Sequence, residues 1–247
     1  MTTIFPAIHG DSWLFYANLI CATFLVFNII GNLLCITLID STVFTSDELM
    51  TRSRFKSDPT AKHWNLCEKC ELVVPPRSWH CDTCDVCVLK RDHHCMFAAN
   101  CVGLRNHRHF LIFLVYFFIG TTYALFYNSY FIWVINSKLF MTWSTAINMA
   151  LPMFMMFNNT GRETHLLYYM LIAIGSALAG VLLVYHGKLV VKNSLTHEKN
   201  NGSYDLGLWP NLHIIFGRKW LMTLVWPFTD SPLPKIYWKT AESSKSK

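Results

Sequence analysis

Charged residues are scarce in this sequence and absent from several long stretches. Asp, Glu, Lys and Arg make up only 15% of the 247 residues, whereas hydrophobic residues make up 53% and the mean hydropathy is +0.29. This composition argues against a soluble globular protein and is typical of a membrane protein. None of the 21 Lys and Arg precedes residue 40. Because residues 1–11 lack the basic start of a secretory signal peptide, we expect no such peptide here.

Two other features are missing. No stretch interleaves basic and aromatic residues on a polar face, so we expect no nucleic-acid partner; the net charge of +6 instead suggests orientation in a membrane with anionic headgroups. Outside one window the only cysteines are Cys21 and Cys35, which lie in an apolar run and are expected to pack. Clustering of the others is typical of metal ligands in a reducing compartment rather than of disulfides. No internal repeat is apparent.

Long uncharged runs take the place of the missing charges. They cover Ser12–Ile39, Phe110–Ile135 and Leu166–Tyr185, with 28, 26 and 20 residues. A helix of about 20 apolar residues crosses the hydrocarbon core of a bilayer. Each run is therefore a predicted transmembrane helix. A fourth run, Leu139–Phe157, is interrupted by several polar residues and Pro152.

The cysteine-rich window spans residues 65–101. It holds seven of the nine cysteines and three histidines. Thiolates and imidazoles in groups of four are the ligands of tetrahedral Zn²⁺, and a Cys-x2-Cys spacing closes a tight turn around one ion. Two such sites use eight ligands, so two of the ten candidates are spare. The ten are Cys67, Cys70, His80, Cys81, Cys84, Cys87, His93, His94, Cys95 and Cys101.

The distribution of basic residues predicts the orientation. Ten Lys and Arg lie between residues 40 and 109 and nine lie beyond 185, so both segments are expected to face the cytosol. This arrangement requires an even number of crossings between them, which leaves Leu139–Phe157 without a complete crossing. The predicted order is a lumenal N-terminus (1–11), a transmembrane helix (12–39), a cytosolic linker (40–64), the cysteine-rich zinc domain (65–109), a transmembrane helix (110–135), a lumenal or half-inserted segment (136–165), a transmembrane helix (166–186) and a cytosolic tail (187–247).

The fold class that follows is mainly α: a polytopic helical membrane protein with a small cytosolic two-zinc cysteine-rich domain of loops and short hairpins. That domain has too little apolar content for a core of its own, so the metals are expected to hold it together. In the tail, Arg218 and Lys219 interrupt the aromatic segment Trp209–Phe228. This segment is expected to dock at the membrane interface rather than to span.

The spare pair of ligands is expected within Asp92-His93-His94-Cys95. A carboxylate, an imidazole and a thiol in close proximity can make an oriented base beside a nucleophile. Neighbouring side chains point apart, so one histidine can bind metal while the other serves Cys95. A histidine partner and a nearby metal favour the reactive thiolate. The alternative is a purely structural zinc module with one redundant cysteine.

These residues resemble the cysteine-rich domain of the DHHC family of protein S-acyltransferases (palmitoyltransferases). The family pattern is Cys-x2-Cys, Pro-x-Arg, His-Cys-x2-Cys-x2-Cys, Asp-His-His-Cys, x5-Cys and Asn-x3-Phe. It is met by Cys67, Cys70, Pro75, Arg77, His80, Cys81, Cys84, Cys87, Asp92 to Cys95, Cys101, Asn106 and Phe110. In the tail, Leu195-Thr196-His197-Glu198 resembles the family's Thr-Thr-x-Glu, and Asn211 falls in its C-terminal motif.

The resemblance implies a role for each group of residues. It implies two interleaved zinc sites, leaves Cys95 as the acyl-accepting nucleophile with His93 as its base, and makes Asp92 the group that orients His93. Thr196 and Asn211 become structural motif residues. Arg77 and Arg91 could meet CoA phosphates, or equally lipid headgroups or nearby acids. The implied zinc ligands are Cys67, Cys70, His80 and Cys87 at one site and Cys81, Cys84, His94 and Cys101 at the other.

The implied activity is transfer of palmitate from palmitoyl-CoA, through a Cys95 acyl-enzyme, to cytosolic cysteines of membrane-associated substrate proteins. The implied location is an endomembrane (ER or Golgi), with the site facing the cytosol and the acyl chain in the lipid bilayer.

Some positions depart from the family pattern. Met96-Phe97 stands where most relatives have Pro-Trp, and the chain has room for one span before the zinc domain where the family has two. The first of these departures favours an alternative, a membrane-anchored zinc adaptor with weak or no transferase activity. A RING-like ubiquitin ligase also uses interleaved zinc, but it does not explain Asp92 and His93 beside a spare Cys95.

Overall fold

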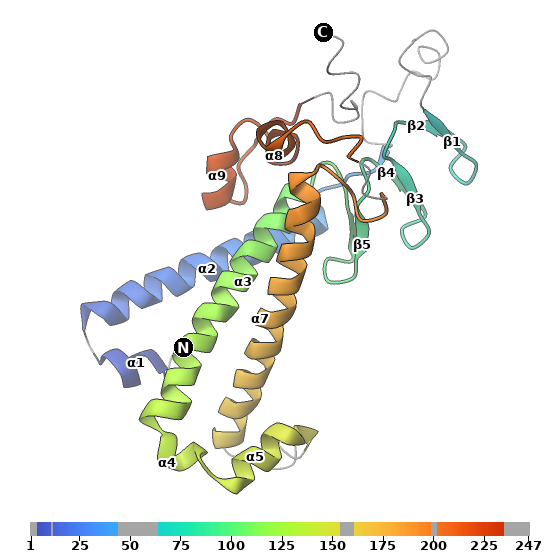
Figure 1. Ribbon diagram of the computed structural model, residues 1–247. Coiled ribbons are helices and arrows are strands. Elements are labelled where there is room, and N and C mark those ends of the chain that lie inside the picture. The colour runs from blue at the N-terminus through green and yellow to red at the C-terminus, as the bar shows by residue number, and fades with distance from the viewer. Residues whose placement is uncertain (1–3, 11, 44–63, 154–160, 199–201, 235–247) are drawn as a thin grey trace. The chain divides into compact units, whose positions relative to one another are not determined.

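The computed structural model describes residues 4–10, 12–43, 64–153, 161–198 and 202–234 (Figure 1). Helices dominate it. Three of them are long and apolar enough to cross a membrane: α2 (Trp13–Leu38), α3 (His107–Ser129), which continues to Ile135, and α7 (Gly161–Val191). Together with a cysteine-rich domain of short hairpins, they confirm the predicted fold class.

The long helices differ in detail from the uncharged runs. The last six residues of the second candidate span form a π-helical segment, η4 (Tyr130–Ile135). Helix α7 begins at Gly161, before the uncharged run, and its first turn carries Arg162 and Glu163 as an ion pair with a 2.8 Å N–O distance. Charged residues in a membrane helix are costly unless they are paired, so this ion pair allows the helix to begin with Arg162 and Glu163.

In the described part of the chain, three short helices precede or connect the long ones. They are α1 (Ile4–His9), α4 (Ser137–Phe140) and α5 (Trp143–Ala150). The Thr142 side chain caps α5 by accepting a hydrogen bond from the Thr145 backbone N–H. Ile132, Phe140 and Leu166 form a buried cluster that joins η4, α4 and α7.

The chain divides into two compact units, Met1–Ile29 with Leu114–Leu183 and Ile30–Phe113 with Val184–Lys247. In the first unit, polar and small residues join the helices. Tyr127 donates a hydrogen bond to Asn18 (2.7 Å), and the hydroxyl groups of Thr122 and Ser176 lie 2.9 Å apart. Such contacts are typical of helices that pack in lipid.

The second unit contains three antiparallel hairpins with the same design. The strands are β1 (Asn65–Cys67) with β2 (Leu72–Val74), β3 (Trp79–Cys81) with β4 (Val86–Val88), and β5 (His93–Cys95) with β6 (Asn100–Val102). Their registers are offset by 14 residues: Cys67 faces Leu72, Cys81 faces Val86, and Cys95 faces Asn100. The expectation that the sequence has no internal repeat is therefore wrong.

The end of α2 is held by two asparagines of this unit. Asn100 donates to the carbonyl of Ile36 (3.0 Å), and buried Asn106 donates to the carbonyls of Ile36 (3.2 Å) and Ile39 (3.3 Å). The last carbonyls of a helix lack intrahelical partners, so these amides cap α2. Further along, His109 of α3 contacts Asn32 of α2 through a 3.1 Å hydrogen bond.

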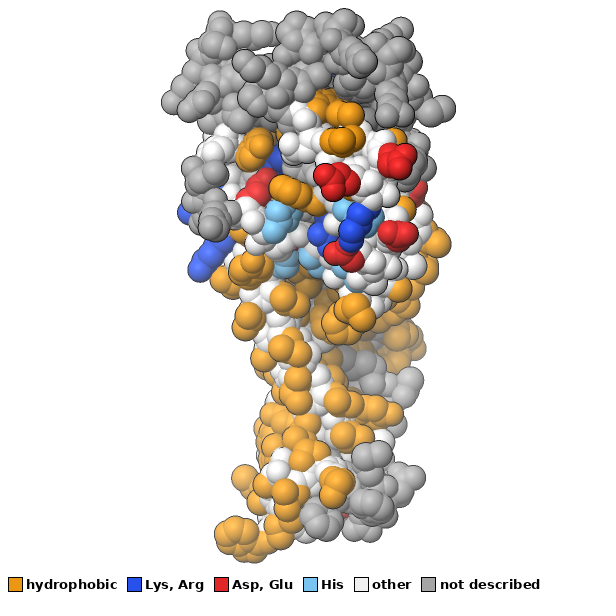
Figure 2. Space-filling view, turned by 90° about the vertical axis from the view of Figure 1, so that its right-hand side faces the viewer, with side chains coloured by type: hydrophobic (Ala, Val, Ile, Leu, Met, Phe, Trp, Pro, Cys, Tyr) orange, Lys and Arg blue, Asp and Glu red, His pale blue; other side chains and the backbone are white. Residues whose placement is uncertain are grey.

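Two short helices form the described part of the tail, α8 (Leu208–Phe216) and α9 (Trp220–Val225). Asn211 is fully buried and donates to the carbonyl of Val191 at the end of α7 (2.6 Å). Trp209, Leu221 and Met222 are more than 60% exposed, as an interfacial segment would be. Figure 2 shows apolar side chains over the long helices, whereas charged and histidine side chains gather over the hairpins.

Candidate metal sites and active site

The first group of metal-capable side chains consists of Cys67, Cys70, His80 and Cys87, whose ligand atoms all lie within 4.8 Å of one another. Cys70 Sγ is 3.3 Å from His80 Nδ1. Thiolate and imidazole ligands of one tetrahedral Zn²⁺ ion lie roughly 3.4–3.8 Å apart. Both the donor set and the spacing therefore fit one zinc ion.

The second group consists of Cys81, Cys84, His94 and Cys101, again within 4.8 Å. His94 Nδ1 lies 3.3 Å from Cys84 Sγ and 3.7 Å from Cys101 Sγ, and the two sulfur atoms are 3.8 Å apart. These distances also fit a tetrahedral zinc site. The two groups contain the eight ligands that the resemblance implied, in the same division.

Strand geometry explains the division. Side chains alternate between the two faces of a strand, and directly opposed residues of a pair share a face. In the middle hairpin His80 faces Cys87, and both belong to the first group, while Cys81 turns to the second. In the last hairpin His94 faces Cys101 in the second group.

Each metal group takes its ligands from two consecutive hairpins. We call residues 67–70, 81–84 and 95–98 knuckles, since each begins with the last cysteine of a strand. The first two knuckles each supply a Cys-x2-Cys pair, and the next hairpin supplies the histidine and the third cysteine. The third knuckle begins with Cys95 but has Ala98 in place of the second cysteine, and helix α3 follows its hairpin. Cys95 belongs to neither group.

The third knuckle keeps the geometry that stabilises a thiolate. Backbone N–H groups of Phe97 and Ala98 hydrogen-bond to Cys95, as those of Lys69 and Cys70 do to Cys67. Burial raises the pKa of Cys95, but the hydrogen bond with His93 and the backbone N–H groups outweigh that effect. The net pKa lies below that of an ordinary thiol.

Asp92 and His93 form a close pair beside this thiol. His93 Nδ1 lies 2.7 Å from Asp92 Oδ2, and the Asp92 side chain is 1% exposed. Burial lowers the pKa of His93, but its hydrogen bonds with Asp92 and Cys95 prevail and raise that pKa to about 9. Burial raises the pKa of Asp92, yet the hydrogen bond from His93 and others bring it well below its usual range. Since β5 alternates, His93 and Cys95 share the face opposite His94.

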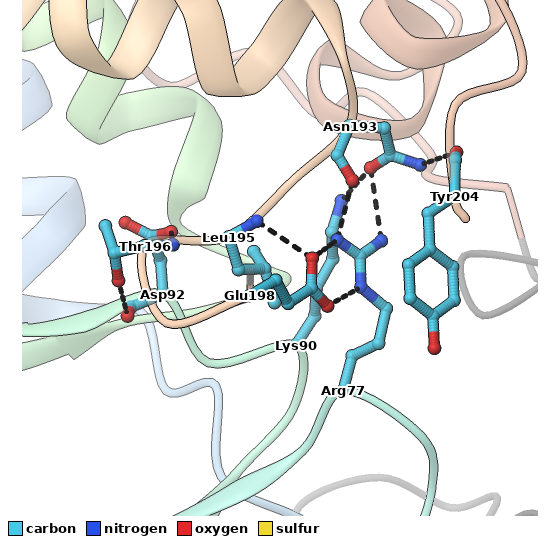
Figure 3. A network of polar contacts seen from close by, with 8 residues as sticks. All are labelled: Arg77, Lys90, Asp92, Asn193, Leu195, Thr196, Glu198 and Tyr204. Atoms are coloured by element: carbon cyan, nitrogen blue, oxygen red, sulfur yellow. Dashed lines mark hydrogen bonds and ion pairs between the residues drawn. The ribbon is translucent and has the colours of Figure 1, made fainter. Parts of the chain in front are cut away.

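The loop after α7 holds the other oxygen of this carboxylate. The Thr196 backbone N–H donates to Asp92 Oδ1 (2.9 Å), and the Thr196 hydroxyl donates to the Asp92 carbonyl (Figure 3). Glu198 accepts from the Leu195 backbone N–H (2.9 Å), which folds the loop back on itself. Thr196 thus fixes the side chain that orients His93.

Arg77 anchors that loop to the zinc domain (Figure 3). Its guanidinium makes two 2.8 Å hydrogen bonds to Glu198 and donates to the Asn193 carbonyl (2.7 Å). It also lies over the Tyr204 ring, 4.1 Å from the centroid, and Lys90 reaches Asn193 Oδ1 at 3.1 Å. Burial, followed by repulsion from Arg77, lowers the pKa of Lys90 well below its usual value.

The two arginines considered for CoA phosphates both have partners within the protein. The Arg77 side chain is 1% exposed and paired with Glu198, an acidic residue, which was one of the alternatives that the sequence left open. Arg91 lies beside Cys81 and Cys101 of the second metal group, with a hydrogen bond to Cys101. A zinc ion with three thiolates and a neutral imidazole carries a net negative charge, which Arg91 would balance.

His186 at the end of α7 was not expected at this site. Its Nδ1 lies 3.6 Å from Asp92 Oδ2, and its ring centroid is 5.4 Å from that of His93. The edge of Phe110 meets both imidazoles, each at 4.8 Å. The only signal in the sequence is a histidine directly after the uncharged run Leu166–Tyr185.

Asp92, His93 and His186 are also a third group of metal-capable side chains. However, the 2.7 Å between His93 and Asp92 is a hydrogen-bond distance, shorter than the roughly 3.3 Å between two ligands of a tetrahedral ion. The geometry of this pair therefore fits a hydrogen bond better than two ligands of one metal ion.

Fold and site together define a helical protein of the membrane type with a two-metal cysteine-rich domain beside an Asp–His–Cys arrangement. The sequence model of the DHHC palmitoyltransferase family matches residues 60–203. The chain belongs to that family.

Similar proteins carry the name Probable palmitoyltransferase ZDHHC24. The human protein is 33% identical over 228 residues, which cover 88% of this chain and 75% of that protein. The rat protein is 31% identical over 69% of this chain, and the zebrafish (Danio rerio) protein 33% over 72%. The chain spans 62% and 61% of the lengths of these last two relatives.

Proposed function

We propose that this protein is an integral-membrane protein S-acyltransferase that moves palmitate from palmitoyl-CoA to cysteine thiols of membrane-associated proteins. One observation carries the proposal: Cys95 lies outside both metal groups, on the same strand face as His93, whose Nδ1 is bonded to Asp92. The family name supports palmitate as the transferred group.

The first step forms an acyl-enzyme. His93 takes the proton of Cys95, and the thiolate attacks the carbonyl carbon of the CoA thioester. The bond from that carbon to the CoA sulfur breaks, and the leaving CoA thiolate takes the proton from His93. Asp92 keeps the Nδ1 proton of His93 in place throughout, so that Nε2 is the atom that exchanges protons with sulfur.

The second step repeats the first with another thiol. His93 takes the proton of a substrate cysteine, whose thiolate attacks the Cys95 thioester. Cys95 leaves as a thiolate and regains a proton from His93. Sulfur suits both steps because it is a good nucleophile and a good leaving group.

The two metal groups would hold zinc in a structural role. All four ligand positions in each group are filled by protein side chains, so a bound zinc ion would add stability to strands of only three residues each. Through His94 and Cys101 it would fix strand β5, which carries His93 and Cys95.

A site at the cytosolic face of a membrane suits this reaction. Burial of a long acyl chain in lipid is favourable by roughly 0.8 kcal/mol per CH₂. Phe110 lies at the start of α3 against His93, where a candidate span begins. The turn residues Met96 and Phe97 are 80% and 90% exposed, so this apolar turn is available to contact lipid.

The test is incubation of purified protein with a clickable palmitoyl-CoA analogue, for wild type, Cys95→Ser and His93→Ala. We expect a hydroxylamine-labile label on wild type, none on Cys95→Ser and much less on His93→Ala. Zinc content should stay at two ions per chain in all three. Loss of zinc from Cys95→Ser would overturn the site assignment.

The same experiment separates the enzyme from a zinc adaptor, which the Met96-Phe97 substitution for Pro-Trp favours. An adaptor would remain unlabelled although it is folded and holds both zinc ions.

A further inference from the structure

Asp92 is a buried carboxylate that accepts hydrogen bonds from two groups and is approached by a third. Thr196 N–H donates to Oδ1 at 2.9 Å, and His93 Nδ1 lies 2.7 Å from Oδ2. The third group is His186 of α7, whose Nδ1 approaches the same Oδ2 to 3.6 Å. A buried carboxylate is costly unless donors surround it, so each approach matters to its position.

His186 Nδ1 is itself buried and has no hydrogen-bond partner among the described residues. The whole side chain is 5% exposed, so bulk water does not supply one. A buried polar atom without a partner calls for an explanation. The Asp92 carboxylate is the charged group that it approaches: His186 Nδ1 lies 3.6 Å from Asp92 Oδ2, 0.9 Å further from this oxygen than His93 Nδ1 is.

The rings are arranged to keep His186 facing this carboxylate. Phe110 meets the His93 and His186 rings edge-on, with interplanar angles of 69° and 78°. The two imidazoles are tilted by 41° to each other and converge on one oxygen. Side-chain packing thus leaves His186 little freedom to turn its Nδ1 elsewhere.

We propose that His186 is a positioning residue for acyl transfer: it holds the Asp92 carboxylate from the side opposite Thr196, and thereby keeps His93 aimed at Cys95. This inference rests on the proposed function for its reaction, but its geometry concerns Asp92, His93 and Cys95 alone. His186 does not touch the thiol and exchanges no proton with it.

Two substitutions separate the polar role from simple packing. His186→Phe keeps a ring of similar shape against Phe110 but removes Nδ1. His186→Asn loses the ring but keeps an amide nitrogen close to the position of Nδ1. Tyr185→Phe, at the neighbouring exposed position, is the matched control.

The experiment measures the single-turnover rate constant of Cys95 acylation, the KM for palmitoyl-CoA and the rate of Cys95 alkylation by iodoacetamide. For His186→Phe we expect the acylation rate constant to fall by about 10–100-fold, the range found when a group that orients a histidine is lost. KM should change less than twofold. His186→Asn should restore the acylation rate constant to within about threefold of wild type, and Tyr185→Phe should match wild type.

Wild-type acylation by His186→Phe would overturn the proposal. So would equal losses in His186→Phe and His186→Asn, since packing alone would then explain the residue. Zinc content of two ions per chain checks the fold of each variant. Alkylation tests the positioning role separately from acyl transfer. If wild type forms no acyl-enzyme, the proposed function fails. The positioning role would still stand if alkylation of Cys95 slows in His186→Phe and recovers in His186→Asn.

Discussion

At the scale of single residues, Cys95 begins a turn like those of Cys67 and Cys81, but the residue three positions later is not a cysteine. Cys67 and Cys81 each have a second cysteine three positions later, whereas Cys95 has Ala98 there. Yet the backbone N–H groups that hydrogen-bond to the sulfur are the same in kind. The proposed nucleophile therefore occupies a turn like those of the metal groups but without the remaining ligands, and this turn favours the anionic form of sulfur.

Ala98→Cys should restore a Cys-x2-Cys pair at the third knuckle. Ala98 holds the position in its turn that Cys70 and Cys84 hold in theirs, so the new thiol would follow Cys95 at the same spacing. We expect added Zn²⁺ or Cd²⁺ to inhibit acylation of this variant at lower concentrations than wild type, because two thiolates chelate a soft ion. Ala98→Ser is the control, and equal metal sensitivity of both variants would contradict the interpretation.

His93→Gln should change the pH dependence of Cys95 reactivity. The hydrogen bond and positive charge of His93 lower the pKa of this thiol, so their removal raises it. The thiolate then forms only at higher pH, and the profile of iodoacetamide alkylation should move upward in pH. Alkylation can be followed at the Cys95 peptide by mass spectrometry; an unchanged midpoint would show that His93 does not interact with the thiol.

At the scale of elements, the buried pair of Arg77 and Glu198 joins the zinc domain to the loop that carries Thr196. Arg77→Met would leave Glu198, only 16% exposed, without its cation. Removal of one partner of a buried ion pair costs about 3–5 kcal/mol. We expect about 3 kcal/mol here, seen as a Tm lower by several degrees in detergent. Lys69→Met is the control, since its ion pair with Asp82 is exposed and should leave Tm unchanged.

The hairpins should unfold when a metal-group cysteine is replaced and stay folded when Cys95 is replaced. Their strands have three residues each and share only a small apolar cluster, so metal would supply much of their stability. Cys81→Ala removes a ligand of the second group, and we expect loss of zinc and unfolding of the domain. Cys95→Ser should keep both ions. Metal analysis and limited proteolysis check this, and zinc retention by Cys81→Ala would contradict the grouping.

The sequence predicted the ligand types and the three long helices because both depend on local pattern. Cys-x2-Cys spacing and uncharged runs of 20 residues or more can be read from neighbouring positions. The 14-residue period was missed because its third copy replaces Cys70 and Cys84 with Ala98, and its first copy has Leu66 where the others have His80 and His94. Only the registers of the three hairpins bring these positions into line.

Contacts between distant segments could not be predicted. His186 lies 94 positions after Asp92, and nothing in its neighbourhood indicates a carboxylate partner. Arg77 carries the charge expected of a phosphate ligand, but its exposed fraction depends on how the loop from Asn193 to Glu198 folds over it. Burial of this kind is a property of tertiary packing rather than of spacing.

At the scale of the whole molecule, the described residues contain three candidate spans, and if all three cross a membrane, residues before the first and after the last lie on opposite sides. Because Lys and Arg are concentrated in residues 40–109 and beyond 185, we expect the zinc domain and tail in the cytosol and the N-terminus in the lumen. In sealed microsomes, protease should remove a C-terminal tag and spare an N-terminal one. The opposite protection pattern would contradict this orientation.

Two potential N-glycosylation sites in the sequence allow a second test of the membrane topology. Asn158-Asn159-Thr160 and Asn201-Gly202-Ser203 both match the acceptor pattern for N-glycosylation, and they flank α7. Enzymes that attach this glycan act in the lumen, so only Asn158 is predicted to be accessible to them. A glycan on Asn201, removed by Asn201→Gln, would place the tail on the wrong side.

Strand β5 carries the metal-group residue His94 between His93, the proposed base, and Cys95, the proposed nucleophile. Oxidation of Cys84 or Cys101 by peroxide would release that histidine and let the strand twist, although neither sulfur ever meets an acyl chain. Acyl transfer would then be lost even in molecules whose Cys95 is still reduced. The proposed activity would thereby depend on the redox state of sulfur atoms that take no part in its chemistry.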